Sequence, residues 1–123
     1  SIFTITSDQT NDILIPFYFD AASDALSGAG AVSVDTYYTA WTTTGADAGT
    51  LADGVVKGQL KKVQLVVDGG NGTLTIASPV STSLDVVTFA DAGDYIKLIW
   101  NGTAWRILES GNDADGATGP AVA

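Results

Sequence analysis

The stretch DYIKLIWNGTAWRILE, residues 94–109, decides the fold class of this chain. Apolar and polar side chains alternate on both sides of Asn101-Gly102, which is the pattern of two strands that flank a tight turn. Asn-Gly at such a point is the strongest local signal for a β-hairpin, because both residues tolerate positive φ. We therefore predict that residues 95–100 and 104–108 pair as antiparallel strands.

Similar β-rich runs, separated by clusters of Gly, Asp, Asn and Ser, fill most of the remaining chain. The run 31–44 predicts either one bent strand or two. With this spacing we expect an all-β fold, an antiparallel β-sandwich or jelly roll of about eight strands. The predicted strands cover residues 2–6, 13–19, 31–44, 59–67, 72–77, 84–89, 94–100 and 104–109.

Four other segments have a different character. Residues 20–26 (DAASDAL) could form one helical turn, since Ala and Leu favour helix and Asp can cap it. The composition of residues 45–54 predicts a loop, and DGGNG at residues 68–72 suggests a second hairpin turn. We expect a single β domain over residues 1–110. A Gly-rich tail over residues 111–123 is expected to be ordered only if something holds it.

The composition excludes several functional classes. The 123 residues include no Cys and no His, which removes disulfides, thiolate chemistry, the commonest general base and the commonest transition-metal ligand. Fourteen acidic residues against five basic ones give a net charge of −9, so binding to nucleic acid or to an anionic membrane is not expected. No apolar segment is long enough to span a membrane, and the N-terminus lacks a signal-peptide pattern.

Two motifs suggest a ligand but favour a simpler interpretation. Asn112, Asp113, Asp115 and Gly116 resemble the start of a calcium loop, yet the bidentate Glu that should close the loop is absent. A solvated tail is the favoured interpretation. The glycines of residues 69–72 suggest a phosphate cradle, but strand pattern follows them where a helix would be needed. We therefore expect no metal and no cofactor.

No catalytic residue is predicted, and we do not expect an enzyme. Asp85, Asp91 and Asp94 could supply paired carboxylates for glycoside hydrolysis. All three lie near strand ends beside turn residues, where Asp is common for conformational reasons. Without His, a nucleophile–base pair could be built only with Lys as the base.

The aromatic residues and one basic cluster are candidates for contacts with a partner. Tyr37 and Tyr38 point to opposite faces of a strand, so one is expected in the core and the other exposed or in an interface. The lysines of KGQLKK, which are Lys57, Lys61 and Lys62, could dock an acidic partner surface. They could equally guard an edge strand against unwanted pairing.

The half of the chain from residue 51 to residue 110 resembles small β-rich virion proteins of tailed bacteriophages, especially marine ones. The resemblance rests on TLADGVVKGQLKKVQLVV at residues 50–67, GNGTLTI at 70–76 and VVTFADAGDYIKLIWNGTAWRIL at 86–108. Such proteins serve as capsid decoration (cement) proteins or as parts of tail fibres. The resemblance concerns fold, and no functional residue carries over from it.

The resemblance implies a decoration protein on the capsid exterior that binds the major capsid protein and stabilises the icosahedral shell. It also implies a homo-oligomer, most simply a trimer. The residues expected at these contacts are the apolar Ile2, Phe3 and Ile5 together with the lysine cluster of residues 57–62. A tail-fibre or spike module that binds host surface glycan is the alternative, and a small glycan-active enzyme is a third hypothesis.

Overall fold

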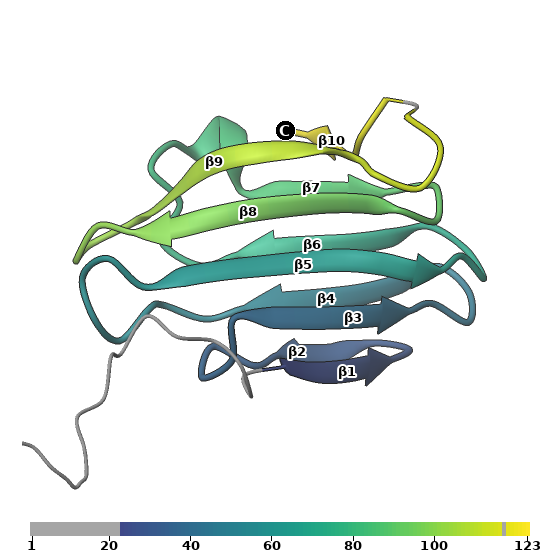
Figure 1. The fold of residues 1–123 in the computed structure, drawn as a ribbon. Coiled ribbons are helices and arrows are strands. Elements are labelled where there is room, and N and C mark those ends of the chain that lie inside the picture. The colour runs from purple at the N-terminus through teal and green to yellow at the C-terminus, as the bar shows by residue number, and fades with distance from the viewer. Residues whose placement is uncertain (1–22, 117) are drawn as a thin grey trace, which may run out of the picture.

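The computed structural model describes residues 23–116 and 118–123, which form two facing β-sheets of five strands each (Figure 1). The front sheet has the strand order β1-β3-β5-β8-β9, and the back sheet has the order β10-β7-β6-β4-β2. The front strands are β1 (Ser23–Ser27), β3 (Tyr38–Thr42), β5 (Leu60–Val67), β8 (Asp94–Trp100) and β9 (Trp105–Asn112). The back strands are β2 (Gly30–Val32), β4 (Asp47–Leu51), β6 (Gly72–Ile76), β7 (Val86–Phe89) and β10 (Ala121–Val122). A single short 3-10 helix in the described residues, η1 (Thr82–Leu84), joins β6 to β7.

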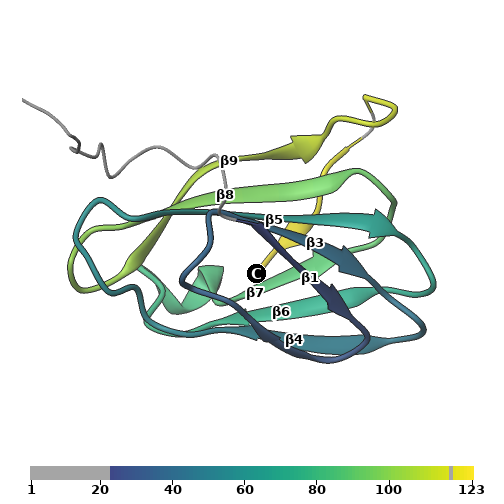
Figure 2. The ribbon, with the colours of Figure 1, turned by 60° about the horizontal axis from the view of Figure 1, so that its bottom comes forward.

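The chain crosses from one sheet to the other at each connection from β1 to β6 (Figure 2). As a result β1, β3 and β5 are parallel neighbours in the front sheet, and β2, β4 and β6 are parallel neighbours in the back sheet. The later strands pair antiparallel in both sheets. The all-β, two-sheet expectation is confirmed. The antiparallel part of it is wrong, because both sheets are mixed.

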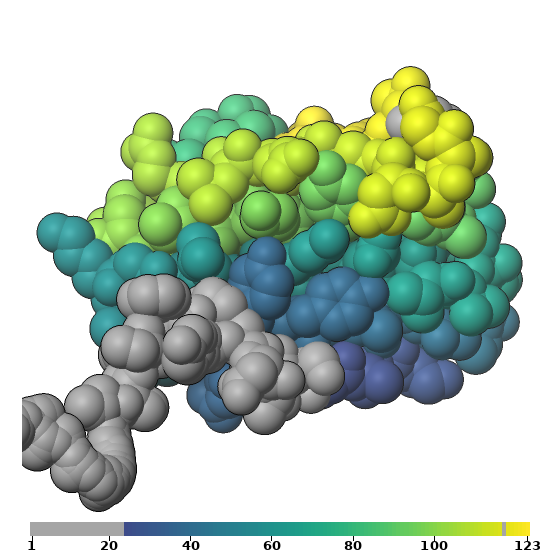
Figure 3. All heavy atoms as spheres, viewed as in Figure 1, coloured from purple at the N-terminus to yellow at the C-terminus, as the bar shows by residue number. Residues whose placement is uncertain are grey.

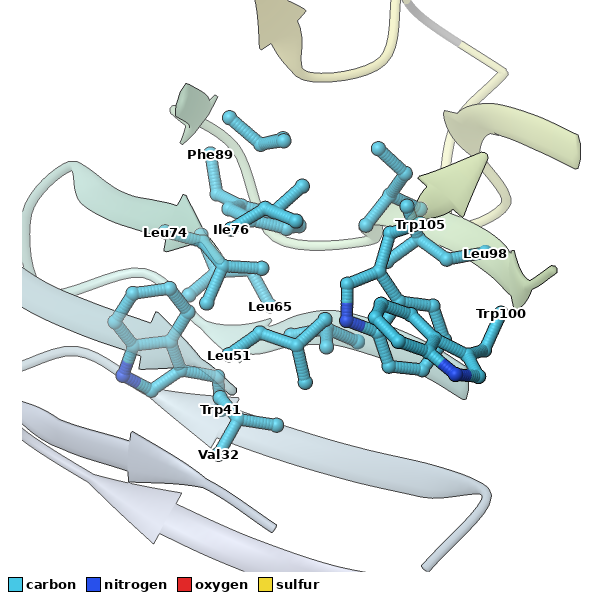
Figure 4. Close-up of a cluster of buried hydrophobic side chains, with 13 residues drawn as sticks. Val32, Trp41, Leu51, Leu65, Leu74, Ile76, Phe89, Leu98, Trp100 and Trp105 are labelled. Carbon is cyan, nitrogen blue, oxygen red and sulfur yellow. The ribbon is translucent and has the colours of Figure 1, made fainter. Parts of the chain in front are cut away.

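The core lies between the sheets (Figure 4). It consists of the inward-facing side chains of both sheets, which occupy every second position along each strand. In β5 the inward positions are Lys61, Val63 and Leu65, while β8 contributes Ile96, Leu98 and Trp100. Alternation of buried and exposed residues along each strand is the pattern expected of a sheet with one buried face. Burial of these side chains supplies the main favourable term in folding.

Trp41 fills one end of the core. Its side chain is fully buried, its ring meets the edge of Phe89 at a centroid distance of 5.7 Å, and Nε1 donates to the Gly28 carbonyl oxygen at 2.9 Å. The indole reaches from the front sheet to Gly49 and Gly72 of the back sheet, where a Cβ would lie 3.0 Å and 2.9 Å from the ring. The two glycines therefore make room for a side chain that spans the sandwich.

Trp100 and Trp105 fill the opposite end. Their rings pack edge to face at 5.3 Å, and Trp105 Nε1 donates to the Ala52 carbonyl oxygen at 2.8 Å. Gly54, in the loop between β4 and β5, lies directly on the Trp100 ring, and a Cβ built on it would overlap the indole. This loop is thus fixed to the core by one glycine and two tryptophans.

The predicted hairpin at Asn101-Gly102 is confirmed, since β8 and β9 pair antiparallel and Trp100 lies opposite Trp105. The turn holds residues 101–104, with Asn101 N donating to the Ala104 carbonyl oxygen at 3.0 Å. Asn101 Oδ1 accepts hydrogen bonds from the backbone amides of Thr103 and Ala104. Only Gly102 has positive φ there, so the side chain of Asn101, rather than a type I′ conformation, stabilises the turn.

Several local predictions are wrong. Residues 68–72 form no hairpin, because β5 and β6 belong to different sheets. Residues 23–26 of the predicted helical turn (20–26) belong to strand β1, and the predicted loop of residues 45–54 contains strand β4. Parallel neighbours hold both segments in extended form despite their weak intrinsic preference.

The C-terminal segment, expected to be ordered only if something holds it, contains parts of two strands. Strand β9 runs on to Asn112, and β10 pairs with β7, where Val86 and Ala123 exchange backbone hydrogen bonds of 2.9 Å. The partner strand β7 is what holds this segment. The strands predicted at residues 2–6 and 13–19 lie outside the described residues.

Replacement of Gly54 by alanine tests how strongly the β4–β5 loop depends on Trp100. We expect Gly54→Ala to lower the free energy of unfolding by about 2 kcal/mol, because the new methyl group must displace a buried indole or the loop backbone. Gly45→Ala is the matched control, since a Cβ there meets no atom within 4 Å, and it should change stability by less than about 0.5 kcal/mol. Urea titration measures both, and equal effects would contradict the packing described.

Candidate functional site

A cluster of two tyrosines and a lysine lies on the outer face of the front sheet, which Figure 3 shows in space-filling view. Lys62, on β5, lies opposite Tyr38 of β3 and is diagonal to Tyr95 of β8. Its ammonium nitrogen is 4.7 Å from the centroid of the Tyr95 ring and 5.9 Å from that of Tyr38. Lys62 therefore makes cation–π contacts on two sides.

Carboxylates and an amide surround this cluster. Tyr95 Oη donates to Glu109 at 2.8 Å, and Tyr38 Oη donates to Gln64 Oε1 at 2.8 Å. Gln64 Nε2 in turn donates to Asp113 at 2.6 Å, and Lys62 lies 3.8 Å from the second Asp113 oxygen. The hydrogen bond to Glu109 is the main cause that raises the pKa of Tyr95.

Burial also raises the pKa of Tyr38, with a smaller contribution from the negative charge of Asp113. Both phenols therefore remain protonated at neutral pH and act as hydrogen-bond donors. The cluster offers aromatic rings, carboxylate acceptors and a lysine donor on a rigid sheet, which is a chemistry suited to protein or sugar contacts. It contains no nucleophile–base pair.

The outer face of the back sheet has a different character. In the described chain, the strands of this sheet carry one charged residue, Asp47, which has the same orientation as the inward-facing Gly49 and Leu51. Cross-strand neighbours such as Thr50 and Thr75, or Thr73 and Thr88, form rows of small side chains across the sheet. The outward residues are Ala31, Ala48, Thr50, Thr73, Thr75, Val86, Thr88 and Ala121.

The lysines predicted as one basic cluster are separated by the structure. Lys57 is exposed in the β4–β5 loop, and Lys62 lies on the outer face of the front sheet. Lys61 is fully buried between the sheets, so its placement in a surface cluster is wrong. The signal was present in the sequence, because Lys61 shares the alternation of Val63 and Leu65, while Lys62 shares that of Gln64.

The buried ammonium of Lys61 has a specific set of partners. It donates to Thr39 Oγ1 at 2.6 Å and to Thr36 Oγ1 and the Thr36 carbonyl oxygen at 3.1 Å each. Asp24 lies 3.8 Å away and accepts hydrogen bonds from both threonine hydroxyls. Burial lowers the pKa of Lys61 to about 8, and the negative charge of Asp24 opposes that shift. The network joins edge strand β1 to β3 and β5.

The residues of the calcium-like motif serve the fold instead. Asn112 is buried and donates to Asp94 and to the Ala92 carbonyl oxygen, both at 3.0 Å. Asp94 also accepts from the backbone amides of Ala90 and Asp91. These contacts join the start of β8 to the end of β9.

The other acids near the start of β8 and the end of β9, which are Asp91, Asp113 and Asp115, do not form a metal site. The charge of Asp115 is the main cause that raises the pKa of Asp91, and Asp113 faces Lys62 instead. Over residues 23–116 and 118–123, no group of three or more acidic side chains could hold a metal ion.

The remaining candidates are placed as follows. Asp85 is the C-cap residue of helix η1, directly before strand β7. Ile2, Phe3 and Ile5 lie outside the described residues. No helix within the described part of the chain is long and apolar enough to cross a membrane.

Comparison with known proteins yields no match: no family model, no curated protein and no solved structure is significantly similar to this chain.

The buried amine predicts a specific pH dependence of stability. Because the pKa of Lys61 is 10.5 when unfolded and about 8 when folded, the unfolded chain binds more protons between these values. Stability should therefore rise with pH across this window, by about 3 kcal/mol in total. Lys61→Met should remove this rise, because the methionine side chain does not titrate.

Urea titrations of both proteins between pH 8 and pH 10 measure this effect. The raised pKa values of Tyr38 and Tyr95 move the ionisation of these two phenols in the folded protein to higher pH than usual. Parallel stability curves for the parent and Lys61→Met would show that Lys61 is not buried as described.

Proposed function

We propose that this protein is a bacteriophage capsid decoration protein, which binds the exterior of the icosahedral shell through the major capsid protein and stabilises it. The protein acts as a homo-oligomer, most simply a trimer. The sequence resemblance suggests this role, and the two-sheet architecture is compatible with it. The role requires no catalytic group and no cofactor.

The observation that carries the proposal is the difference between the two outer faces. The front sheet carries Lys62, Lys97, Arg106 and Glu109 on its outer side, whereas the described outward positions of the back sheet are Ala, Thr and Val. Charged residues are depleted from the cores of protein–protein interfaces, because desolvating them costs free energy. The back sheet is thus the face suited to lie on another protein, and the front sheet is suited to face water.

Each bound copy would stabilise the assembled shell by mass action, since the protein binds the assembled lattice and not the separated subunits. The rigid, hydrogen-bonded back sheet loses little conformational entropy on docking. Function in this proposal is mechanical: the added contacts resist the pressure of packaged DNA.

Removal of the protein from particles tests the cement role directly. Particles of the encoding phage that lack this protein should release DNA at a lower temperature and after milder osmotic shock than complete particles. An unchanged release threshold would remove the cement role. A loss of host adsorption instead would favour the tail-fibre alternative.

A lysine placed on the back sheet identifies the docking face. Thr75→Lys puts a charge at the centre of the charge-free face, and we expect it to weaken binding to stripped particles about tenfold or more, because the charge must be desolvated. Thr42→Lys, on the outer side of the front sheet, is the matched control and should bind like the parent. Co-sedimentation with particles measures both, and equal binding of the two variants would overturn the assignment of the face.

The tail-fibre alternative has one observation in its favour, the Tyr38–Lys62–Tyr95 cluster on the front sheet. Tyrosine rings beside carboxylate and amide groups can bind neutral sugars by stacking and hydrogen bonding. A glycan array prepared from host surface polysaccharide tests this function. Binding that Tyr95→Ala abolishes would support it, and the absence of any bound glycan would count against it.

A further inference from the structure

The triplet Asn-Gly-Thr occurs twice in the chain, at residues 71–73 and 101–103. In an Asn-Gly pair the side chain of the asparagine meets little steric hindrance from the next residue, because glycine has no Cβ. The backbone nitrogen of the glycine can then attack the side-chain carboxamide, and the amide nitrogen is lost as ammonia. Since the two triplets have the same local sequence, a difference in their reactivity must come from the fold.

The fold holds the first triplet rigid. Gly72 begins strand β6 and is paired on both sides, with Asp47 of β4 and with Phe89 of β7. The Asn71 carbonyl oxygen accepts a hydrogen bond from Asp47 N at 3.2 Å, which fixes the peptide group between Asn71 and Gly72. Gly72 is also buried beneath the Trp41 ring, where a Cβ would lie 2.9 Å from the indole. The Gly72 nitrogen is therefore held in the sheet and is not free to attack.

The second triplet lies in the turn between β8 and β9 and has a different environment. Asn101 Oδ1 accepts hydrogen bonds from the backbone amides of Thr103 and Ala104, at 2.9 Å and 2.8 Å. These bonds bend the carboxamide back over the backbone that follows it, in which Gly102 is the first residue. Gly102 is exposed, has a φ of +102°, and its nitrogen donates no hydrogen bond to any described residue. The attacking nitrogen is thus accessible and lies beside its target.

We propose that Asn101 is a site of spontaneous modification, which converts to aspartate and isoaspartate in the folded protein while Asn71 is protected. The Gly102 nitrogen forms a bond to Asn101 Cγ, and the bond from Cγ to Nδ2 breaks. The amide proton of Gly102 passes through solvent to the departing nitrogen, so that neutral ammonia leaves. A water molecule then opens the cyclic imide at either carbonyl carbon, which gives aspartate or isoaspartate. Water is the only co-reactant.

The hydrogen bonds that hold Asn101 Oδ1 also favour the reaction. Negative charge develops on this oxygen as the tetrahedral intermediate forms, and preorganised donors aimed at it stabilise that charge. Besides the two backbone amides, Thr103 Oγ1 donates to the same oxygen at 3.1 Å. Among the described residues Asn101 Nδ2 has no hydrogen-bond partner, so no contact is broken when this nitrogen leaves.

The product changes the end of the sandwich that Trp100 and Trp105 occupy. Isoaspartate lengthens the backbone by one carbon, and both products place a negative charge where the Asn101 carboxamide was neutral. Because this turn joins Trp100 to its cross-strand partner Trp105, a longer turn loosens their packing. The modification depends only on the turn and on water, and it is independent of the proposed function.

Peptide mass spectrometry of the purified, folded protein, incubated at mildly alkaline pH, tests the proposal. Both triplets are followed in one sample, so Asn71 is an internal control with the same local sequence. We expect Asn101 to convert at least about tenfold faster than Asn71, with isoaspartate among the products. In denaturing urea the two sites should convert at rates within about twofold of each other, because the fold no longer distinguishes them.

A pair of variants tests the part played by the hydrogen bonds. Thr103→Pro removes both Thr103 donors to Asn101 Oδ1 and leaves Asn-Gly intact, so it should slow conversion of Asn101 about tenfold. Thr103→Ser keeps both donors and is the matched control, and tryptophan fluorescence checks that both variants fold. Absence of conversion at Asn101, conversion of Asn71 at an equal or higher rate in the folded parent, or equal rates in the two folded variants would each overturn the inference. Should Thr103→Pro not fold, the comparison of the two triplets in the parent still decides it.

Discussion

The fit of Trp41 between the two sheets is the constraint on which the rest of the structure depends. The indole starts on the front sheet and ends against Gly49 and Gly72 of the back sheet, so the two glycines must lie diagonally to each other, two residues apart in the register of neighbouring parallel strands. Its ring nitrogen is bonded to the Gly28 carbonyl oxygen in the arch that leads from β1 to β2. One side chain thereby fixes the spacing of the sheets, the register of β4 against β6 and the path of the first crossing.

The arrangement of the strands in two facing sheets also gives the molecule two unlike outer faces, one on the front sheet and one on the back sheet. Because each strand shows alternate residues to the core and to the outside, neighbouring lysines such as Lys61 and Lys62 have opposite roles. One is a buried anchor for the edge strand β1, and the other is the centre of an aromatic cluster on the front face. The back sheet leaves only small uncharged side chains outside, which gives an acidic protein one face without electrostatic repulsion.

The sequence predicts the strand content and the β8–β9 hairpin, because alternation and Asn-Gly are local signals. It does not predict the parallel winding, since alternation is the same for a strand with parallel or antiparallel neighbours. Strand β4 (DAGTL) has the composition of a loop, because Gly49 makes room for Trp41 of the facing sheet, a contact that the alternation within one strand cannot reveal. The burial of Lys61 could have been inferred from the sequence, because Lys61 lies two residues before Val63 and therefore on the same face of β5. The uncharged outer face of the back sheet could not have been inferred, because its residues come from five separate strands.

In the proposed function, the outer surfaces of the two sheets carry the role of the protein. The proposed function requires that the protein lies on the shell of a phage in many copies. Quantitative mass spectrometry of purified particles tests this requirement, by the molar ratio of this chain to the major capsid protein. A decoration protein should be present in numbers of the same order as the shell protein itself, whereas absence from particles, or the few copies typical of a tail component, would contradict the proposed function.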